Sequence, residues 1–259
     1  MTVYYPSVYY LKIYLCKMNS SKTVLILGAN SDVAKQAIKL YINKGYSVVA
    51  ASRNLKSLEK FADEHHLDKS KSEIKYFDAT DFSSHQDFYD GLTVKPNIVV
   101  YAAGFLVENQ EALKNFVGTF EMMKTNYIGA VSILNIIAMD NSNKSLERII
   151  GLSSLSGVRG RKSNFVYGST KSAFTQYLAG LRQELTSREI IVNVLVIGYI
   201  NTKINAGLEL SKNLIMEPDY VAKFIINAGN SFEIVPNWKW KIIYWILKLS
   251  PEFLVAKLP

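Results

Sequence analysis

The chain alternates short apolar runs with longer segments in which apolar residues recur at helical spacing. The apolar runs, rich in Val and Ile, are residues 23–27, 47–50, 74–77, 98–101, 148–152 and 191–197. Such runs are typical of strands buried on both faces of a sheet. The amphipathic segments are residues 32–43, 55–65, 84–92, 116–139 and 167–188. Their regular alternation predicts a doubly wound α/β domain, in which helices cover both faces of a parallel sheet.

Composition limits the class of protein. The 259 residues are 49% hydrophobic, enough for one large domain, and no linker or repeat divides them. A single cysteine, Cys16, excludes a disulfide framework and a cysteine-based metal site, and it indicates a reducing compartment. With only three histidines we expect no metal centre. The net charge of +8 permits binding to nucleic acid, anionic lipid or a phosphorylated ligand, and does not choose among them.

The first predicted strand leads directly into a turn that suits a phosphate. Gly28 would let a pyrophosphate approach the backbone, and the helix that follows offers free N–H groups at its N-terminus. A dinucleotide fingerprint would have further glycines where Asp32 and Ala34 stand, so the turn alone does not identify the ligand. The candidate cofactor contacts here are Gly28, Asn30, Ser31, Asp32 and Val33.

Arg53 ends the second predicted strand, 25 positions after Gly28. An acidic residue near this position usually binds the ribose of NAD, whereas an arginine suits the 2′-phosphate of NADP. No acidic residue occurs in residues 50–54, so the sequence favours NADP(H) over NAD(H). The alternative is a solvated arginine at a strand end.

Tyr167 and Lys171 stand four residues apart, and Ser154 lies upstream of them. On a helix, positions four apart share a face, so the Lys171 ammonium is expected to lower the pKa of the Tyr167 phenol and fit it for proton transfer. Pairs with this spacing are common on solvated helices, so other motifs must decide the function.

Taken in order, these motifs resemble the short-chain dehydrogenase/reductase family over residues 22–236. The matching residues are Gly28, Asp78, Ala102-Ala103-Gly104, Asn126, Ser154, Tyr167 with Lys171, and Gly198 to Thr202. The resemblance implies one NADP-binding, Rossmann-type catalytic domain. It also implies an enzyme that reduces a carbonyl to an alcohol by hydride transfer.

The resemblance assigns four catalytic roles. Tyr167 would donate the proton, and Lys171 would depress its pKa and hold the nicotinamide ribose. Ser154, 13 residues before Tyr167, would orient the substrate oxygen, and Asn126 would anchor a water chain that relays protons to Lys171.

The resemblance also implies the remaining cofactor contacts. The implied residues are Asp78 and Ala79 at the adenine, Ala102, Ala103 and Gly104 at the adenosine ribose, and Gly198, Ile200 and Thr202 near the nicotinamide. Two departures from the family pattern, Tyr101-Ala102 and Ile197, bear on cofactor affinity rather than on the reaction. The non-enzymatic alternative is an NADPH-binding regulator that has kept the fold.

Residues 237–259 form a separate, amphipathic segment. On a helical wheel Lys241 and Lys248 share a stripe flanked by Tyr244 and Trp245. The opposite side holds Ile242, Ile243, Ile246, Leu247 and Leu249. This pattern is typical of a helix lying in a membrane interface, and it is shorter than the roughly 20 residues that span a bilayer. The alternative is a helix that docks on the domain or forms an oligomer contact.

The glycine turn, residues 160–171 and the C-terminal segment together resemble the decaprenylphosphoryl-2-keto-ribose reductase branch of the family. Members of that branch reduce the keto group of a sugar carried on a polyprenyl phosphate. The resemblance implies a lipid-linked keto-sugar substrate, with Arg159, Arg161 and Lys162 as candidates to meet its phosphate. A solvated basic loop is equally compatible, and the alternative substrate is a soluble 3-oxoacyl or steroid-like ketone.

The expected setting follows from these inferences. We expect a cytoplasmic protein, peripheral at the inner face of the membrane, that binds no nucleic acid. Family members often pair through the helices equivalent to 116–139 and 167–188, which implies a homodimer or homotetramer. Residues 1–21 are an N-terminal extension with five tyrosines and no signal-peptide pattern, and Met18 stands where such proteins usually begin. The extension is either a mis-assigned start, which we favour, or a second membrane contact.

Overall fold

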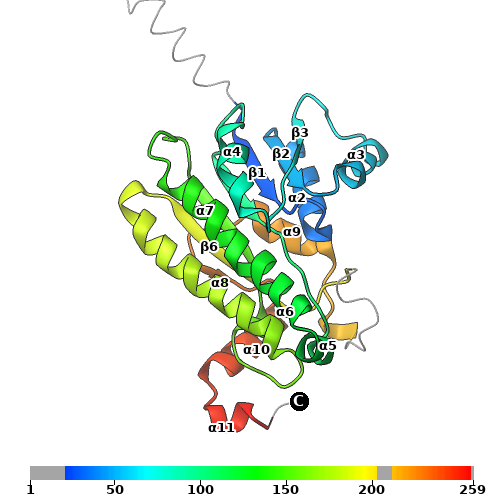
Figure 1. Cartoon of the computed structure of the whole chain (residues 1–259), viewed down its shortest axis with the longest axis vertical. Helices are drawn as coiled ribbons and strands as arrows, with labels where there is room; N and C mark the ends of the chain where they lie inside the picture. The colour runs from blue at the N-terminus through cyan, green and yellow to red at the C-terminus, as the bar shows by residue number, and fades with distance from the viewer. Residues whose placement is uncertain (1–20, 203–211, 258–259) are drawn as a thin grey trace, which may run out of the picture.

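Seven parallel strands form the central sheet of the computed structural model, which describes residues 21–202 and 212–257 (Figure 1). In sheet order the strands are β3 (Ser72–Tyr76), β2 (Ser47–Ser52), β1 (Thr23–Leu27), β4 (Ile98–Tyr101), β5 (Arg148–Ser154), β6 (Ile191–Ile197) and β7 (Glu233–Ile234). Leu27 pairs with Ala51 on one side and Tyr101 on the other, so the carboxyl ends of the central strands lie level. The predicted parallel sheet is confirmed.

Helices cover both faces of this sheet, as an all-parallel sheet requires. The described α-helices are α2 (Asp32–Asn43), α3 (Leu55–Glu64), α4 (His85–Asp90), α5 (Asn109–Lys114), α6 (Phe116–Met123), α7 (Gly129–Met139), α8 (Phe165–Glu184), α9 (Pro218–Ile226), α10 (Trp238–Leu249) and α11 (Glu252–Val255). α2 packs against α9, while α7 contacts both α4 and α8. Figure 1 shows α7 and α8 crossing in front of the sheet.

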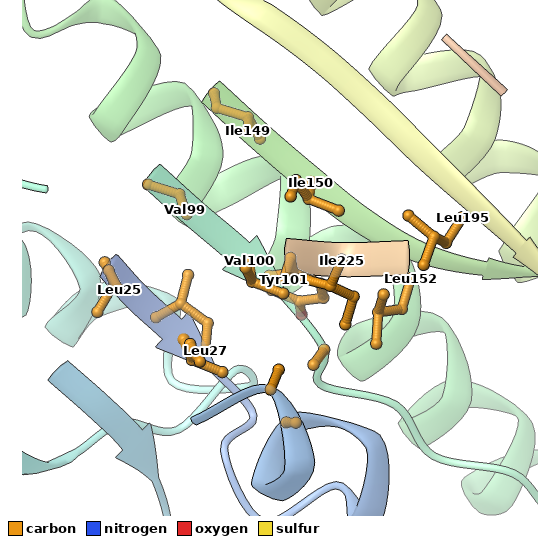
Figure 2. Close-up of a cluster of buried hydrophobic side chains, with 14 of the residues drawn as sticks. Leu25, Leu27, Val99, Val100, Tyr101, Ile149, Ile150, Leu152, Leu195 and Ile225 are labelled. Carbon is orange, nitrogen blue, oxygen red and sulfur yellow. The ribbon is translucent and has the colours of Figure 1, made fainter. Parts of the chain in front are cut away.

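The central strands supply the hydrophobic core. Figure 2 shows side chains from four neighbouring strands and α9 meeting there: Leu25, Leu27, Val99, Val100, Ile149, Ile150, Leu152, Leu195 and Ile225. All of them are buried, and burial contributes about 25 cal/mol for each Å² of apolar surface removed from water. The sheet is therefore a firm support for the loops that leave its carboxyl ends.

The sequence predicts one helix over residues 116–139, but the structure divides it. A π-helical turn, η2 (Lys124–Ile128), separates α6 from α7. At the junction a Cβ added to Gly129 would lie 1.9 Å from the Ala79 carbonyl oxygen, so only glycine permits this approach. The Tyr101 hydroxyl donates a hydrogen bond of 2.6 Å to the Thr125 carbonyl and ties the turn to β4. Such π turns are frequent at functional sites, and this one carries Asn126.

The C-terminal helix α10 docks on the domain with one face and leaves another exposed. Trp240, Tyr244 and Leu247 are buried in the main core, while Ile242 and Ile246 are more than half exposed. The predicted alternative, a helix that docks on the domain, therefore describes this face of α10. Burial of Tyr244 is possible because Glu233 accepts hydrogen bonds from both its hydroxyl and Lys248. Within the two described ranges, no helix has both the length and the apolar character needed to cross a bilayer.

Arg159 holds the end of α10 in place. Its Nε donates to the Leu247 carbonyl at 3.1 Å, and its Nη2 donates to the Ser250 carbonyl at 3.1 Å. A cation at a helix C-terminus satisfies carbonyls that lack an intrahelical partner and complements the helix dipole. The prediction that Arg159 meets a substrate phosphate is therefore wrong, since its guanidinium is occupied by backbone. Residues 1–20 of the predicted N-terminal extension lie outside the described residues, as do residues 258–259 of the predicted tail.

Candidate active site

A cavity of 1120 Å³ opens at the carboxyl ends of the central strands. Residues that follow five strands line it: Gly28 after β1, Arg53 after β2, Ala102 after β4, Ser154 at the end of β5, and Gly198 after β6. Its volume exceeds the roughly 300–1,000 Å³ of pockets for drug-sized ligands. The cavity extends across the ends of five strands, and its length and volume are sufficient for a dinucleotide with a substrate beside it.

The structure brings nearly all of the predicted site residues to this cavity. Those lining it are Gly28, Asn30, Ser31, Asp32, Val33, Arg53, Asp78, Ala79, Ala102, Ala103, Gly104, Ser154, Tyr167, Lys171, Gly198, Ile200 and Thr202. Asn126 is the exception, because it lies fully buried behind the wall.

The glycine turn has the geometry that a pyrophosphate needs. Gly28 adopts φ +84°, and a Cβ there would lie 2.2 Å from the Ala103 backbone nitrogen. The turns after β1 and β4 therefore touch through backbone alone. Ser31 and Asp32, at the N-terminus of α2, face the cavity, where helix N–H groups and the positive dipole end favour phosphate.

The end of β2 offers polar groups to the adenosine side of a dinucleotide. Asn30 is fixed by hydrogen bonds from its Nδ2 to Ser52 Oγ at 2.8 Å and to the Asn54 carbonyl at 2.7 Å. Its Oδ1 is buried and has no hydrogen-bond partner within residues 21–202 and 212–257. Arg53 is exposed and lines the same part of the cavity. An acceptor and a cation side by side fit a ribose that carries a hydroxyl and a phosphate.

Helix α8 carries the central pair. Tyr167 lies in its first turn, and Lys171 lies one turn later with its Nζ 5.9 Å from the centroid of the Tyr167 ring. The Lys171 ammonium donates to the Leu152 carbonyl at 3.0 Å and is buried. Ser154, at the end of β5, accepts a hydrogen bond from the Ser156 backbone N–H at 3.2 Å. The hydroxyl, the phenol and the ammonium thus come from adjoining elements and face one cavity.

The electrostatics of this pair differ from the sequence-based expectation. Burial raises the pKa of Tyr167 to about 12, and hydrogen bonding with Ser154 opposes the rise only in part. Burial also lowers the pKa of Lys171 to about 8. Lys171 was expected to depress the phenol pKa, but removal from water dominates in this structure. At neutral pH the phenol therefore keeps its proton and can donate it.

Asn126 positions the segment that follows β4. Its Nδ2 donates to the Phe105 carbonyl at 2.8 Å and to Thr170 Oγ1 at 3.0 Å, and its Oδ1 accepts from the Phe105 N–H at 2.8 Å. A Cβ at Gly104 would lie 3.7 Å from both Asn126 Oδ1 and Lys171 Nζ. Asn126 therefore links the cavity wall to α8 directly behind Lys171.

The individual residues of one wall of the cavity were not predicted from the sequence. Trp240 and Ile243 of α10 and Leu214 line it. The Trp240 ring covers Gly198, where a Cβ would lie 2.2 Å from the ring, and its Nε1 donates to the Leu214 carbonyl at 2.8 Å. Trp240 is 42 positions from Gly198, so no local motif could reveal the contact. The signal in the sequence was the glycine after β6, which leaves room for a close neighbour.

The buried ammonium should make stability depend on pH. In the unfolded chain Lys171 has its ordinary pKa near 10.5, so from about pH 8 to 10.5 the unfolded state binds more protons, and this residue's contribution to stability rises with pH. At about pH 7 the charge costs about 3 kcal/mol. We therefore expect Lys171→Met to gain stability relative to the wild type at neutral pH and to lose that gain by about pH 10. Urea unfolding of both proteins across this range measures the difference, and a difference that stays constant with pH would contradict the expectation.

Comparison with known proteins agrees with this geometry. Residues 22–213 match the short chain dehydrogenase family. An uncharacterized oxidoreductase of Mycobacterium tuberculosis is 24% identical over 246 residues, which cover 91% of this chain and 96% of that protein. An uncharacterized oxidoreductase of Staphylococcus epidermidis is 24% identical over 210 residues, 80% of this chain and 90% of that protein. Both are described only as oxidoreductases, so these matches support the family and give no support for the decaprenylphosphoryl-2-keto-ribose reductase branch.

Solved structures share the fold. The chain resembles a short chain dehydrogenase from Burkholderia cenocepacia in complex with NADP with a TM-score of 0.75, at 16% identity and over 91% of this chain and 96% of that chain. ElxO with NADP bound gives a TM-score of 0.76 at 20% identity, over 86% of this chain and 100% of that chain. The family match covers most of the chain, including every strand from β1 to β6 and the pair on α8. The chain therefore belongs to the short-chain dehydrogenase family of NAD(P)-dependent oxidoreductases.

Proposed function

We propose that this protein reduces the keto group of a lipid-linked sugar at the membrane surface, with NADPH as cofactor and Tyr167 as proton donor. The observation that carries the proposal is that one helix, α10, both lines the cavity and exposes a second apolar face to solvent. A substrate held in a bilayer requires an enzyme that contacts the membrane, and this face supplies an apolar surface for that contact.

The residues fit the direction of reduction. A bound NADPH would supply the hydride to the carbonyl carbon. Tyr167, whose pKa of about 12 keeps it protonated at neutral pH, donates its proton to the carbonyl oxygen, which becomes the alcohol. The Ser154 hydroxyl orients that oxygen. Lys171, whose pKa is about 8, remains largely charged at neutral pH and stabilises the phenolate that the transfer leaves.

The choice of NADPH rests on Arg53. Its guanidinium lies at the end of β2, lines the cavity beside Asn30 and forms no ion pair within the described part of the chain. A carboxylate at this position would repel a 2′-phosphate, whereas a guanidinium binds one through paired N–H groups. Two of the proteins with the same fold were solved with NADP bound, which agrees with this choice.

The membrane contact rests on the outer apolar surface, which we define as the exposed apolar side chains of α10 and α11. Its members are Trp238, Ile242, Trp245, Ile246, Leu249, Phe253 and Leu254. Leu249 is 74% exposed and Phe253 is 66% exposed, an arrangement that is costly in water. Residues 238–257 contain four lysines and one glutamate, so the surface is also basic. Aromatic and aliphatic side chains beside lysines suit a bilayer that contains anionic lipid.

Further apolar side chains lie at the same end of the molecule. Leu113 of α5 and Phe116, Val117 and Phe120 of α6 are also exposed. Figure 1 shows α5, α10 and α11 at one end of the long axis, away from β3 and α3. Gly118 of α6 packs against Val107, which lines the cavity. A bilayer beneath this end would therefore meet apolar groups from two parts of the chain that both border the cavity.

The proposal is tested by following NADPH oxidation with lipid-linked keto-sugars in detergent or vesicles, with NADH as the comparison. We expect turnover of the lipid-linked ketone and a preference for NADPH. Turnover of soluble 3-oxoacyl or steroid-like ketones alone would contradict the proposed substrate class and support the proposed type of reaction. NADPH binding without turnover of any ketone would favour a regulator.

The membrane contact can be tested without removing α10, whose inner face belongs to the core. We expect the double change Ile242→Glu and Ile246→Glu to weaken binding to anionic vesicles by about tenfold or more, because each isoleucine contributes roughly 1.5 kcal/mol or more when buried. Co-sedimentation with vesicles of anionic phospholipid measures the partition. The matched control is Val94→Glu with Met139→Glu, two exposed apolar residues that precede the central strands β4 and β5, at the end of the sheet opposite the cavity. Equal losses in both double variants would mean that charge, and not this surface, governs binding.

A further inference from the structure

The loop between β5 and α8 places two side chains with unpaired polar atoms at the wall of the cavity. Arg161 and Asn164 both line it. Arg161 Nε and Asn164 Oδ1 are buried atoms without a hydrogen-bond partner in the described part of the chain. A buried donor or acceptor left unpaired costs free energy, so native structures satisfy nearly all such groups with protein, water or a bound group. The geometry points to a ligand group that accepts from Arg161 and donates to Asn164.

The loop that holds these groups is anchored at several points. Asn164 Nδ2 donates to Ser156 Oγ at 2.8 Å, which fixes the direction of its Oδ1. The buried Asn109 side chain donates to the Lys162 carbonyl at 3.3 Å and accepts from the Val166 N–H at 3.2 Å. Arg161 and Asn164 are therefore presented on a fixed backbone, as a binding site requires.

Arg161 lies too far along the sheet to serve the adenosine end of the cofactor. Arg53 follows β2, whereas the loop with Arg161 follows β5, and β1 and β4 lie between those strands. Three strand spacings of about 4.8 Å separate the two ends by about 14 Å. Arg161 instead stands on the loop that connects Ser154 with Tyr167, the side where the substrate must lie. The cavity thus has one arginine toward each end, Arg53 and Arg161, in addition to Lys171.

Glu108, the neighbour of the Asn109 that contacts this loop, does not neutralise the Arg161 guanidinium. Glu108 lines the cavity, but its Oε2 caps α5 by accepting from the Gln110 N–H at 2.8 Å and the Glu111 N–H at 3.1 Å. Arg161 forms no ion pair within residues 21–202 and 212–257. Its guanidinium is therefore available for an anion from outside the chain.

We propose that Arg161 and Asn164 form a substrate subsite for a phosphate that lies next to a hydroxyl group. Arg161 binds the phosphate oxygens, and Asn164 Oδ1 accepts a hydrogen bond from the hydroxyl. The subsite rests on the proposed reductase function and makes its specificity narrower, because it selects phosphorylated, hydroxylated ketones over neutral apolar ones. A water-soluble keto-sugar phosphate and a phosphate esterified to a lipid present the same chemistry to it.

Binding to the cofactor-free protein tests the subsite apart from turnover. Calorimetric titration with xylulose phosphate and with xylulose is expected to show at least tenfold tighter binding of the phosphate ester. Arg161→Leu should remove that difference, and Arg161→Lys should restore part of it, because lysine keeps the charge and loses the paired donors. Lys162→Leu is the control, since Lys162 is an exposed neighbour that does not line the cavity. Equal binding of ester and sugar by the wild type would overturn the proposal.

Turnover separates this proposal from the proposed function. With a soluble keto-sugar phosphate and its polyprenyl ester, Arg161→Leu is expected to raise KM for both by about 10- to 100-fold, the effect of losing a charged hydrogen bond, and to raise KM for a neutral ketone far less. A rise in KM for the neutral ketone of the same size would show a merely structural role and overturn the subsite. Absence of turnover with every ketone would instead refute the reductase function, while the binding difference would still stand.

Discussion

Replacing Tyr167 by Phe is expected to lower kcat for ketone reduction by about 10²–10⁴-fold, the usual contribution of a positioned general acid. The variant loses one oxygen atom from a side chain that is only partly exposed, and the ring still fills the start of α8. Among the described residues that line the cavity, Tyr167 is the one group whose pKa is raised. NADPH oxidation under saturating substrate measures the loss, and fluorescence titration should find the Kd for NADPH within about twofold of the wild type.

The matched control is Tyr177→Phe, on the same helix. The Tyr177 hydroxyl donates to Asn135 Oδ1 at 2.8 Å and does not line the cavity. We expect it to keep kcat unchanged. A Tyr167→Phe enzyme that retained most of its activity would remove this residue from the chemistry and favour the regulator.

Replacing Gly28 by Ala is expected to destabilise the fold by about 2–4 kcal/mol, from roughly 1 kcal/mol for the positive φ and about 1–3 kcal/mol for overlap in a packed region. The added Cβ would lie 2.2 Å from the Ala103 nitrogen and 2.4 Å from its Cα, both of them backbone atoms that cannot rotate away. Because the turn must shift to relieve this overlap, NADPH affinity should fall by at least about tenfold. Urea unfolding and NADPH titration measure the two effects.

Gly45→Ala separates the two causes. Gly45 has nearly the same φ, +87°, and a Cβ there would meet nothing within 4 Å. Gly45→Ala should therefore lower the free energy of unfolding by only about 1 kcal/mol, the cost of the positive φ, and should leave the NADPH affinity unchanged. Similar losses of stability in the two variants would mean that the close approach of Gly28 to Ala103 is unimportant.

The fold was predictable because most of its elements have their own periodic pattern. β1 and β6 read as buried runs, and α2 reads as an amphipathic helix, so the sheet followed from local signals. β7 has only two residues, too few for any pattern, and it pairs through the backbone of Val194 and Leu195. The break at η2 was also invisible, since it depends on contact between Gly129 and Ala79 across the domain.

The site residues were predictable to the extent that they follow strands or share a helical turn. Gly28, Arg53 and Tyr167 are in that group, and their catalytic and binding roles remain predictions. Two properties depended on tertiary packing instead. The pKa of Tyr167 is set by burial, which no local spacing encodes. Arg159 donates to carbonyls at the end of α10, nearly 90 residues further along the chain, so its partners could not be predicted from the loop itself.

The double role of α10 has a consequence for how such an enzyme can diversify. Trp240 and Ile243 shape the reaction chamber, and Ile242 and Ile246 of the same turns point outward. A substitution that tilted α10 and so reshaped the cavity would also move Ile242 and Ile246, so substrate preference and the proposed membrane contact would evolve together. For the same reason, an inhibitor that displaced Trp240 from Gly198 would change both the shape of the cavity and the proposed membrane contact.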